Sequence, residues 1–227
     1  MNLPEPLQQI MRMVSGYWTS QVLYVAAKLG LADLLKEGPK TAEDLASATQ
    51  THPRALYRVL SSSASLGLFA EDEQKRFSLT PLSDWLRSDV PGSQRATAVI
   101  VGDLLYRAWG ELLYSLQTGR SAFEKVHGLP FFEYLSQNPE QASVFDEAMA
   151  MHGWATTAIL EAYDFSGIRV LADIGGGNGS AITAILKKYP NMRGILFDLP
   201  GGSRAGQAEH PSCWSSGSVS RNRRQLH

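Results

Sequence analysis

The feature that most constrains the fold is a glycine-rich turn between two short apolar runs. The first run, Val170–Ile174, has strand length and leads directly into four glycines: Gly175, Gly176, Gly177 and Gly179. Residues without a Cβ allow a tight turn and a close approach of the backbone to a ligand. An apolar repeat at helical spacing follows, and the second run, Ile195–Phe197, ends at Asp198. Because both runs are mostly apolar, we expect two buried parallel strands joined by a helix, which is a βαβ unit.

The position of Asp198 gives this unit a chemical meaning. An acid about 20 residues beyond such a turn can accept hydrogen bonds from both ribose hydroxyls of an adenosine-like ligand. The dinucleotide pattern Gly-x-Gly-x-x-Gly (or Ala) does not fit, because Ser180 or Ile182 occupies its last position in the two possible registers. A Gly-x-Gly-x-Gly loop preceded by an acid, here Asp173, resembles the first motif of S-adenosylmethionine-dependent methyltransferases. An ordinary glycine-rich turn between a strand and a helix is the alternative interpretation.

Composition narrows the classes of function. The 227 residues carry a formal net charge of -1, which provides no basic field for nucleic acid. Cys213 is the single cysteine, so an internal disulfide and a cysteine zinc cluster are excluded and no metal site is expected. The amino terminus lacks the features of a signal peptide, and no apolar run reaches membrane-spanning length. We therefore expect a cytoplasmic protein without a membrane or nucleic-acid partner.

The first 90 residues have the pattern of a small helical domain that ends in a hairpin. Apolar residues repeat at helical spacing from residue 16 to 35, and Thr41 is placed to cap a second helix. A third helix ends at Gly67, and residues 68–79 contain the two short runs and the polar turn of a hairpin. The order of helix, turn, helix and hairpin predicts a winged-helix domain.

Two uses of such a domain are open. It could bind DNA through the helix after Thr51, or it could serve as a packing and dimerisation module. A DNA-reading helix presents several basic and amide side chains, whereas this one offers Arg54 and Arg58 among serines. The dimerisation module is therefore favoured. Tyr17 and Trp18 are interpreted as core or dimer contacts.

Residues 91–165 are expected to be mainly helical. The segment Gln94–Thr118 is apolar around much of its circumference, which predicts one long and largely buried helix. A second long helix is predicted from Asn138-Pro139 to Tyr163.

Residues from about 16 to 200, about four fifths of the chain, resemble the plant caffeic-acid and hydroxyindole type O-methyltransferases and their bacterial relatives. The resemblance is carried by Ser-Leu-Gly-Leu-Phe, by Gly-Leu-Pro-Phe-Phe-Glu-Tyr-Leu, by Val-Phe-Asp-Glu-Ala-Met, and by Leu-Ala-Asp-Ile-Gly-Gly-Gly-Asn-Gly with Phe-Asp-Leu-Pro. It implies a homodimer that transfers a methyl group from S-adenosylmethionine to a hydroxyl of a small, usually aromatic, molecule.

The resemblance also implies a division of the chain. Residues 1–90 would form a mainly α winged-helix dimerisation domain, and residues 91–165 a helical connector that lines the acceptor pocket. Residues 166–200 would be the first βαβ unit of a truncated α/β Rossmann-like methyltransferase domain. Residues 201–227 would be an irregular tail.

Site residues are carried over by position in the motifs. The residues expected to contact the cofactor are Asp173, Gly175, Gly176, Gly177, Gly179, Asp198 and Leu199. Phe145 and Met149 match positions that line the acceptor pocket in the family, and they lie one helical turn apart. His152 could face the same site. The alternatives are plain core residues for the first two and a structural histidine for the third.

After Pro200 the resemblance ends. Family members continue with further strands and helices and with a histidine that serves as general base, and no residue of this chain matches that histidine. We therefore expect a carboxyl-truncated cofactor domain with two strands, weak cofactor binding and no activity. A non-catalytic dimerisation partner is the alternative. If the nucleotide sequence that encodes Ser212–Leu226 is read one nucleotide later, it can encode a segment that resembles the family's continuation. This indicates a frameshift. A native disordered tail is the other explanation.

Overall fold

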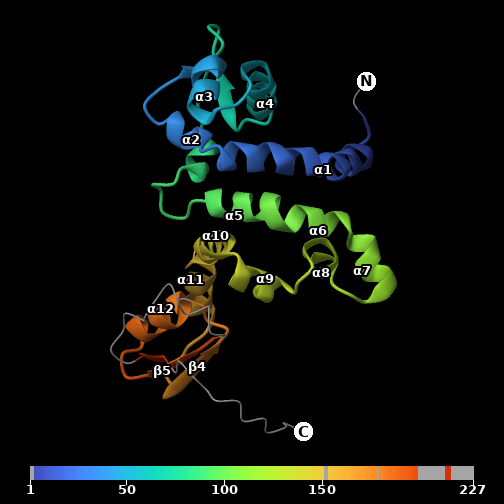
Figure 1. Ribbon diagram of the computed structural model, residues 1–227. Coiled ribbons are helices and arrows are strands. Elements are labelled where there is room, and N and C mark those ends of the chain that lie inside the picture. Colours follow the sequence, from blue (N-terminus) through green and yellow to red (C-terminus); the bar gives the residue numbers. More distant parts are fainter. Residues whose placement is uncertain (1–2, 151–152, 178, 199–212, 216–227) are drawn as a thin grey trace. The chain divides into compact units, whose positions relative to one another are not determined.

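The computed structural model describes residues 3–150, 153–177, 179–198 and 213–215 (Figure 1). The chain divides into two compact units, Met1–Ala148 (unit 1) and Met149–His227 (unit 2). The interval 91–165, expected as one connector, contributes residues to both units. Each unit has its own buried cores and is described by itself.

Unit 1 is mainly helical. Its elements are α1 (Glu5–Lys28), α2 (Leu31–Leu34), β1 (Lys40–Thr41), α3 (Ala42–Thr49), α4 (Pro53–Ser65), β2 (Phe69–Glu71), β3 (Arg76–Leu79), the 3₁₀-helix η1 (Ser83–Leu86), α5 (Arg95–Ile100), the π-helix η2 (Val101–Leu105), α6 (Tyr106–Gly110), α7 (Leu112–Thr118), α8 (Ala122–His127), α9 (Phe131–Gln137) and the greater part of α10 (Pro139–Ala150).

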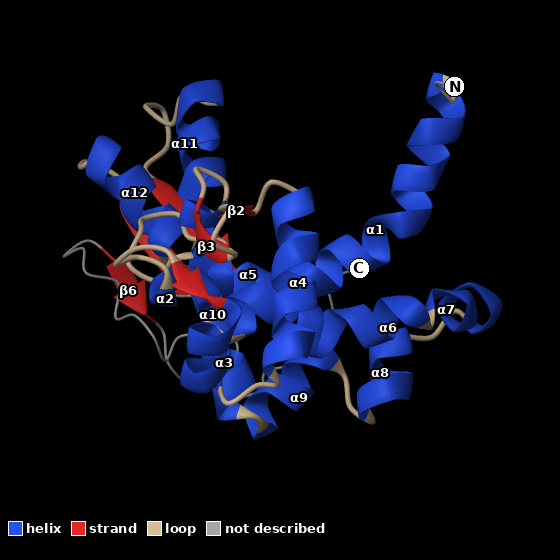
Figure 2. Cartoon of the chain, turned by 90° about the horizontal axis from the view of Figure 1, so that it is seen from above, coloured by secondary structure: helices blue, strands red, loops and turns tan. Residues whose placement is uncertain are grey.

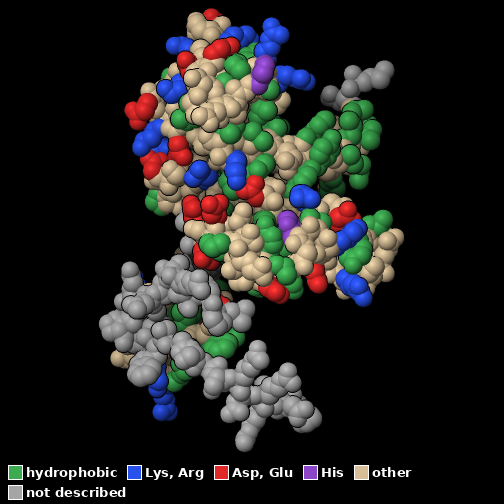
Figure 3. Space-filling view, viewed as in Figure 1, with side chains coloured by type: hydrophobic (Ala, Val, Ile, Leu, Met, Phe, Trp, Pro, Cys, Tyr) green, Lys and Arg blue, Asp and Glu red, His purple; other side chains and the backbone are tan. Residues whose placement is uncertain are grey.

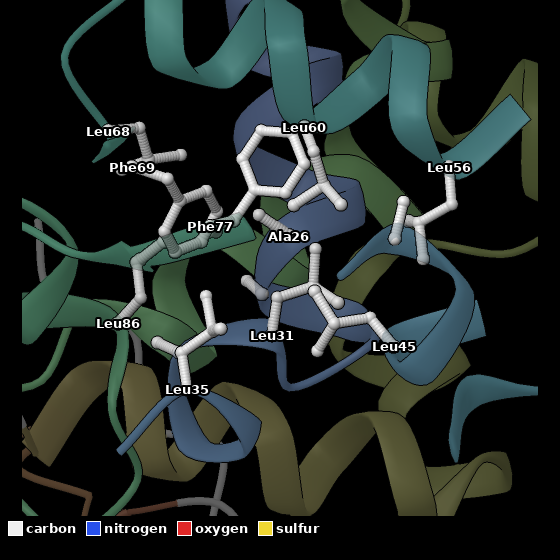
Figure 4. Close-up of a cluster of buried hydrophobic side chains, with 14 of the residues drawn as sticks. Ala26, Leu31, Leu35, Leu45, Leu56, Leu60, Leu68, Phe69, Phe77 and Leu86 are labelled. Atoms are coloured by element: carbon white, nitrogen blue, oxygen red, sulfur yellow. The ribbon is translucent and has the colours of Figure 1, made fainter. Parts of the chain in front are cut away.

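The first core of unit 1 lies between the end of α1, helices α2 to α4 and the small sheet (Figure 4). Phe69 and Phe77 from the sheet pack with leucines of the helices, and Leu31, Leu45 and Leu60 are fully buried. Burying a Leu or Phe side chain contributes about 1.5–3 kcal/mol, so this cluster holds the amino-terminal helices to the sheet. A second core joins α5, η2, α6, α8, α9 and α10.

The structure confirms the predicted cap at the start of α3 and the predicted glycine stop after α4. The Thr41 side chain accepts a hydrogen bond from the Asp44 amide, and the Asp44 carboxylate accepts one from the Thr41 amide, which completes a capping box at the start of α3. Gly67, with φ 75°, follows the end of α4 and leads into the predicted hairpin of β2 and β3.

One strand of the small sheet was not expected. The sheet has the order β1-β3-β2 and is antiparallel throughout, with Lys40 opposite Phe77. β1 has only two residues, so it carries no alternation that a pattern could detect. Pairing with β1 satisfies the backbone groups on the outer edge of β3.

The long helix predicted for Gln94–Thr118 is wrong in its continuity. The segment forms α5, the π-helix η2, α6 and α7, with a break at Glu111. The π-helix lies where this segment packs against α1. A Cβ on Gly102 would lie 2.1 Å from ring atoms of Tyr24, so only glycine allows α1 to approach this closely. Tyr24 donates a hydrogen bond to Asp103 at 2.5 Å, and Lys28 contacts the same carboxylate.

The same segment is also less buried than predicted. Trp109, Leu113 and Leu116 are 67%, 65% and 76% exposed, and Leu112 is exposed as well. Residues 5–18 of α1 carry a second row of exposed apolar side chains, which ends with Tyr17 and Trp18; Figure 3 shows this apolar surface. Both helical stretches project from the rest of unit 1 (Figure 2). Apolar periodicity therefore identified these faces, but unit 1 alone does not cover them.

Unit 2 contains the expected βαβ unit. Its elements are α11 (Gly153–Ala162), β4 (Val170–Ile174), α12 (Ser180–Lys188), β5 (Arg193–Phe197) and β6 (Cys213–Ser215). β4 and β5 are parallel, with Ile174 opposite Phe197, and α12 is the connection between them. Ile182, Ile185 and Leu186 of α12 form a core with Leu196 of β5. The sequence predicts this unit correctly.

Two details of unit 2 differ from expectation. The strands are not buried on both faces: Val170 and Ile174 are 51% and 72% exposed, because α12 packs against the opposite side of the sheet. The tail was expected to be irregular and the sheet two-stranded, but β6 pairs in parallel with β5. A third strand satisfies the backbone groups that β5 would otherwise leave unpaired at its edge.

Candidate functional site

The glycine turn at the carboxyl end of β4 has the backbone conformation that the sequence requires. Gly175, Gly177 and Gly179 have φ values of 77°, 56° and 74°, in the left-handed region where a Cβ causes strain. The Gly175 amide donates to the Phe197 carbonyl at 2.7 Å, which ties the turn to the end of β5. The Gly179 amide donates to the Gly176 carbonyl at 2.9 Å and closes the turn just before α12.

Gly176 is needed for a different reason, which is space. A Cβ at this position would lie 2.5 Å from both the Asp173 carboxyl carbon and a methyl group of Leu196. The backbone of the turn therefore packs directly on the residues that end β4 and β5. Gly194 has the same role within β5, because a Cβ there would lie 2.6 Å from Leu186 of α12. Gly194 was not assigned a role from the sequence, because the predicted strand began at Ile195; a glycine directly before that apolar run is the signal that could have found it.

Asp198 lies at the glycine turn, as predicted. The Gly177 amide donates a hydrogen bond to Oδ2 of Asp198 at 2.6 Å, across 21 residues of sequence. The parallel register produces this contact, since Ile174 and Phe197 are partners and each strand ends beside the other. Parallel strands joined by a helix bind ligands at their carboxyl ends, so this edge is where a nucleoside would be held.

Asp173, the acid before the turn, is in an unusual environment. Its Oδ2 atom is buried and has no hydrogen-bond partner within the described residues. Burial raises the pKa of the Asp173 carboxyl, and the negative charge of Asp198 raises it further. A hydrogen bond from the backbone amide of Ile182 acts in the opposite direction. The candidate cofactor residues thus place two carboxyl groups on one glycine turn.

The predicted acceptor residues are only partly described. Phe145 and Met149 both lie on α10, where Phe145 is half-buried and Met149 is 45% exposed. His152 and Leu199 lie outside the described residues.

Aromatic neighbours of Phe145 were not assigned from the sequence. The rings of Phe131 and Phe132, at the start of α9, lie 5.2 and 6.2 Å from the Phe145 ring in edge-on arrangements. The cluster of aromatic residues at 128–135 was the available signal, but the spacing along the chain does not show which ring meets Phe145.

Unit 1 also contains an apolar pocket of about 320 Å³. Its lining residues are Leu105, Ala108, Trp109, Leu112, Ser115, Ala122, Phe123 and Phe131. Phe131 therefore borders the pocket and also contacts Phe145. The Ser115 hydroxyl accepts a hydrogen bond from the Ala122 amide.

Two kinds of feature do not occur within the described residues. No group of three or more His, Cys, Asp or Glu side chains that could hold a metal ion occurs there. No helix in this part of the chain is both long and apolar enough to cross a membrane.

Comparison with known proteins matches both the amino-terminal and the carboxyl-terminal part of the chain to O-methyltransferase domains. Residues 11–89 match the O-methyltransferase dimerisation domain, and residues 109–213 match the O-methyltransferase domain. A phenazine O-methyltransferase of Lysobacter antibioticus is 46% identical over 202 residues, which cover 88% of this chain and 59% of that protein. The chain thus spans about three fifths of the length of this relative.

Solved structures of methyltransferases also match most of this chain. The crystal structure of LaPhzM superposes with a TM-score of 0.86 at 42% identity and covers 96% of this chain and 67% of its own. An O-methyltransferase from neocarzinostatin biosynthesis, solved with S-adenosylmethionine and 2-hydroxy-5-methyl naphthoic acid, has a TM-score of 0.73 at 31% identity. That match covers 82% of this chain and 58% of the other.

Proposed function

The chain belongs to the S-adenosylmethionine-dependent O-methyltransferase family, and we propose that it binds S-adenosylmethionine at the glycine turn for methyl transfer to a hydroxyl of a small aromatic molecule. Relatives act on such molecules, and the matches do not favour the alternatives of a DNA-binding protein or a non-catalytic partner. The observation that carries the proposal is the hydrogen bond between the Gly177 amide and Asp198.

The residues at the turn fit this cofactor. Three left-handed glycines and the close packing of Gly176 leave backbone, rather than side chains, at the surface that would meet the methionine part. Asp198 stands beside the turn, where its carboxylate can accept hydrogen bonds from ribose hydroxyls. When bound, S-adenosylmethionine supplies an electrophilic methyl group on a sulfonium sulfur. We assign cofactor contacts to Asp173, to the four glycines of the turn, to Asp198 and to Leu199.

The acceptor side is proposed to be aromatic. Phe145 and Met149 line the pocket for the methyl acceptor, and Phe131 and Phe132 extend its wall through their contacts with Phe145. Edge-on aromatic contacts of this kind stabilise flat rings by about 0.5–1.5 kcal/mol beyond simple burial. His152 is proposed to face the same site. The relatives' phenazine and naphthoate substrates suggest fused-ring phenols as acceptors.

No residue of this chain is assigned as general base. His52 lies at the start of α4, and His127 contacts the Leu104 carbonyl at 3.1 Å; neither belongs to the unit that holds the glycine turn. A general base contributes about 10²–10⁴-fold to the rate of such a transfer.

Calorimetry and a labelled-methyl assay test this function. The chain is titrated with S-adenosylmethionine and with S-adenosylhomocysteine, and Asp198→Ala is expected to abolish the heat of binding. A matched control is Asp164→Asn, which changes an exposed acid of the same unit that bonds Ser166 instead. Hydroxylated phenazines and naphthoates serve as acceptors. No binding of either nucleoside by the parent chain would refute the proposed cofactor site.

We further propose that the amino-terminal part forms a winged-helix module that mediates homodimerisation. Helices α3 and α4 are followed by the β2–β3 hairpin, and β1, which precedes α3, completes the sheet; this order supports the winged-helix assignment. Two apolar faces support dimerisation: residues 5–18 of α1, with Tyr17 and Trp18 stacked at 5.7 Å, and the face of α6 and α7 around Leu116 (Figure 3). Exposed apolar faces of this size mark protein interfaces.

Light scattering tests the homodimer. The parent chain is expected to be dimeric at micromolar concentration, while Trp18→Glu and Leu116→Glu give monomers. Leu66→Glu is the control, because Leu66 is an exposed leucine at the end of α4, outside both faces. A monomeric parent chain would refute dimerisation without affecting the cofactor proposal.

A further inference from the structure

Asp173 is enclosed on the sides that the structure describes. It is the fourth residue of β4 and pairs with Leu196 of β5. The Gly176 backbone packs against its carboxyl group so closely that a Cβ there would lie 2.5 Å from Oδ2. Oδ2 itself is buried without a hydrogen-bond partner. An ionised carboxylate in this position loses part of its hydration, and the backbone amide of Ile182 only partly offsets this loss.

The charged groups around Asp173 do not compensate for this loss. Asp198, at the end of β5, faces it and has the same charge when ionised. From α12, the contribution is the backbone amide of Ile182, while the basic residues Lys187 and Lys188 lie in the last turn, far from the glycines. Arg193 pairs with Val170 at the opposite end of the strands. Within the described part of unit 2, therefore, no cation stabilises an ionised Asp173.

We propose that Asp173 carries a proton while the turn is empty and releases it to solvent when a cationic ligand binds there, so that the site favours the sulfonium methyl donor over its neutral thioether product. This inference rests on the proposed function, because it assumes that the cofactor lies on the glycine turn. It adds to that function a residue that distinguishes cofactor from product.

The charge difference between the two ligands makes this selection possible. S-adenosylmethionine has one more positive charge than S-adenosylhomocysteine, because the sulfonium becomes a thioether when the methyl group leaves. A positive charge beside a buried carboxyl favours its ionised form, and the low-dielectric surroundings strengthen the effect. The product lacks that charge, so Asp173 keeps its proton when the product binds, and the product gains no such attraction.

The affinity of the site for the cationic ligand should depend on pH. Burial and Asp198 hold the pKa of Asp173 above its ordinary value in the empty site, and a bound cation lowers it. The cation therefore binds more tightly to the deprotonated chain. Its affinity should rise with pH, by up to about tenfold per pH unit below the pKa of the empty site, and become constant above it. The affinity for S-adenosylhomocysteine should change much less.

The experiment measures proton release directly. Calorimetric titrations of the parent chain with each nucleoside are run in two buffers of different ionisation enthalpy, over about pH 5 to 8, which gives the number of protons released. We expect close to one proton for S-adenosylmethionine at a pH between the two pKa values of Asp173, and a clearly smaller number for S-adenosylhomocysteine. Asp173→Asn, which mimics the protonated form, should abolish both the proton release and the preference for the cation. Asp164→Asn should retain both.

A second measurement covers the case in which Asp173→Asn fails to fold. Carbon-detected NMR follows the Asp173 carboxyl of the parent chain during an acid titration, with and without S-adenosylmethionine. A pKa above the ordinary aspartate range that falls on binding supports the proposal. Binding without a pH dependence, or an Asp173 that already titrates in the ordinary range when empty, overturns it while the cofactor site stands. If S-adenosylmethionine does not bind at any pH, both the proposal for Asp173 and the proposed cofactor site are overturned.

Discussion

The backbone amide of Gly177 and the carboxylate of Asp198 are joined by a hydrogen bond of 2.6 Å although 21 residues separate them. The bond links the turn after β4 to the end of β5, so the two parts of the candidate nucleoside site hold each other in place. A carboxylate that accepts a backbone hydrogen bond contributes about 1.5–3 kcal/mol. The site is therefore partly assembled before any ligand arrives.

Replacing Asp198 should loosen the turn as well as remove a ligand contact. In Asp198→Ala the Gly177 amide loses its acceptor, so its hydrogen exchange should accelerate by about 10-fold or more. The Gly179 amide, which donates to the Gly176 carbonyl, provides an internal control and should change little. Asp198→Asn keeps an acceptor oxygen and should give an intermediate rate. Equal exchange of the Gly177 amide in all three chains would show that the bond does not persist in solution.

The close packing of Gly176 predicts a sensitive position. Gly176→Ala places a methyl group 2.5 Å from Asp173 and Leu196, and the backbone must shift to relieve the contact. Overpacking of this kind costs about 1–3 kcal/mol, so unit 2 should unfold at lower denaturant and cofactor binding should be lost.

Gly167→Ala is the matched control in the same unit. A Cβ on Gly167 meets no atom within 4 Å, so the free energy of unfolding should change by less than about 0.5 kcal/mol. If the two variants are equally stable, the turn is not packed as described.

The position of the glycine site could be predicted from the spacing of its residues along the chain. Spacing alone indicated that Asp198 would reach the turn, since a parallel βαβ unit brings the ends of its strands together. The orphaned oxygen of Asp173 was not predictable, because it depends on the packing of Gly176 and Leu196 and not on the order of residues in the chain. Likewise, nothing in the sequence pattern specifies that Phe145 meets Phe131 and Phe132 rather than other rings.

For the fold, predictions that depend on a few neighbouring residues were reliable, whereas features that depend on contacts between distant segments were not predicted. Thr41 with Asp44 and the left-handed Gly67 mark helix ends by local hydrogen bonds and dihedral preference. The predicted long helix is interrupted at Glu111 and is π-helical at Gly102, where Tyr24, 78 residues earlier in the chain, packs against it. Apolar periodicity at Leu116 showed an apolar face, but not whether this chain or a second molecule covers it.

The crossing of α1 with the π-helix gives a prediction for unit 1. Gly102→Ala drives a methyl group into the Tyr24 ring, at 2.1 Å from its nearest atoms, and should cost about 1–3 kcal/mol of stability or more. Gly16→Ala lies inside α1 with no atom within 4 Å of the new methyl group. It should instead stabilise the helix by about 0.5–1 kcal/mol. Chemical denaturation of both variants distinguishes them, and a Gly102→Ala chain as stable as the parent would contradict the close crossing.

The hydroxyl of Tyr24 predicts how the stability of unit 1 depends on pH. The hydrogen bond to Asp103 is the main cause that raises the pKa of Tyr24 from 10.0 to about 12, with burial and the Asp103 charge adding to it. Because the folded chain holds this proton more tightly than the unfolded chain, the contribution to stability is complete below pH 10.0 and is lost as the pH rises toward about 12. Tyr24→Phe removes this contribution and should destabilise unit 1 by about 1 kcal/mol near neutral pH.

The comparison of Tyr24→Phe with the parent chain at several pH values tests this directly. The difference in free energy of unfolding should shrink between pH 10.0 and about 12, as the parent loses the tyrosine proton. Tyr163→Phe is the control, because Tyr163 is 55% exposed and belongs to unit 2, and it should leave the free energy of unfolding of unit 1 unchanged at every pH. Ultraviolet titration of the tyrosines gives an independent value, in which the parent should show one more late-titrating hydroxyl than Tyr24→Phe. A constant difference across this pH range would mean that the bond to Asp103 does not control the ionisation of Tyr24.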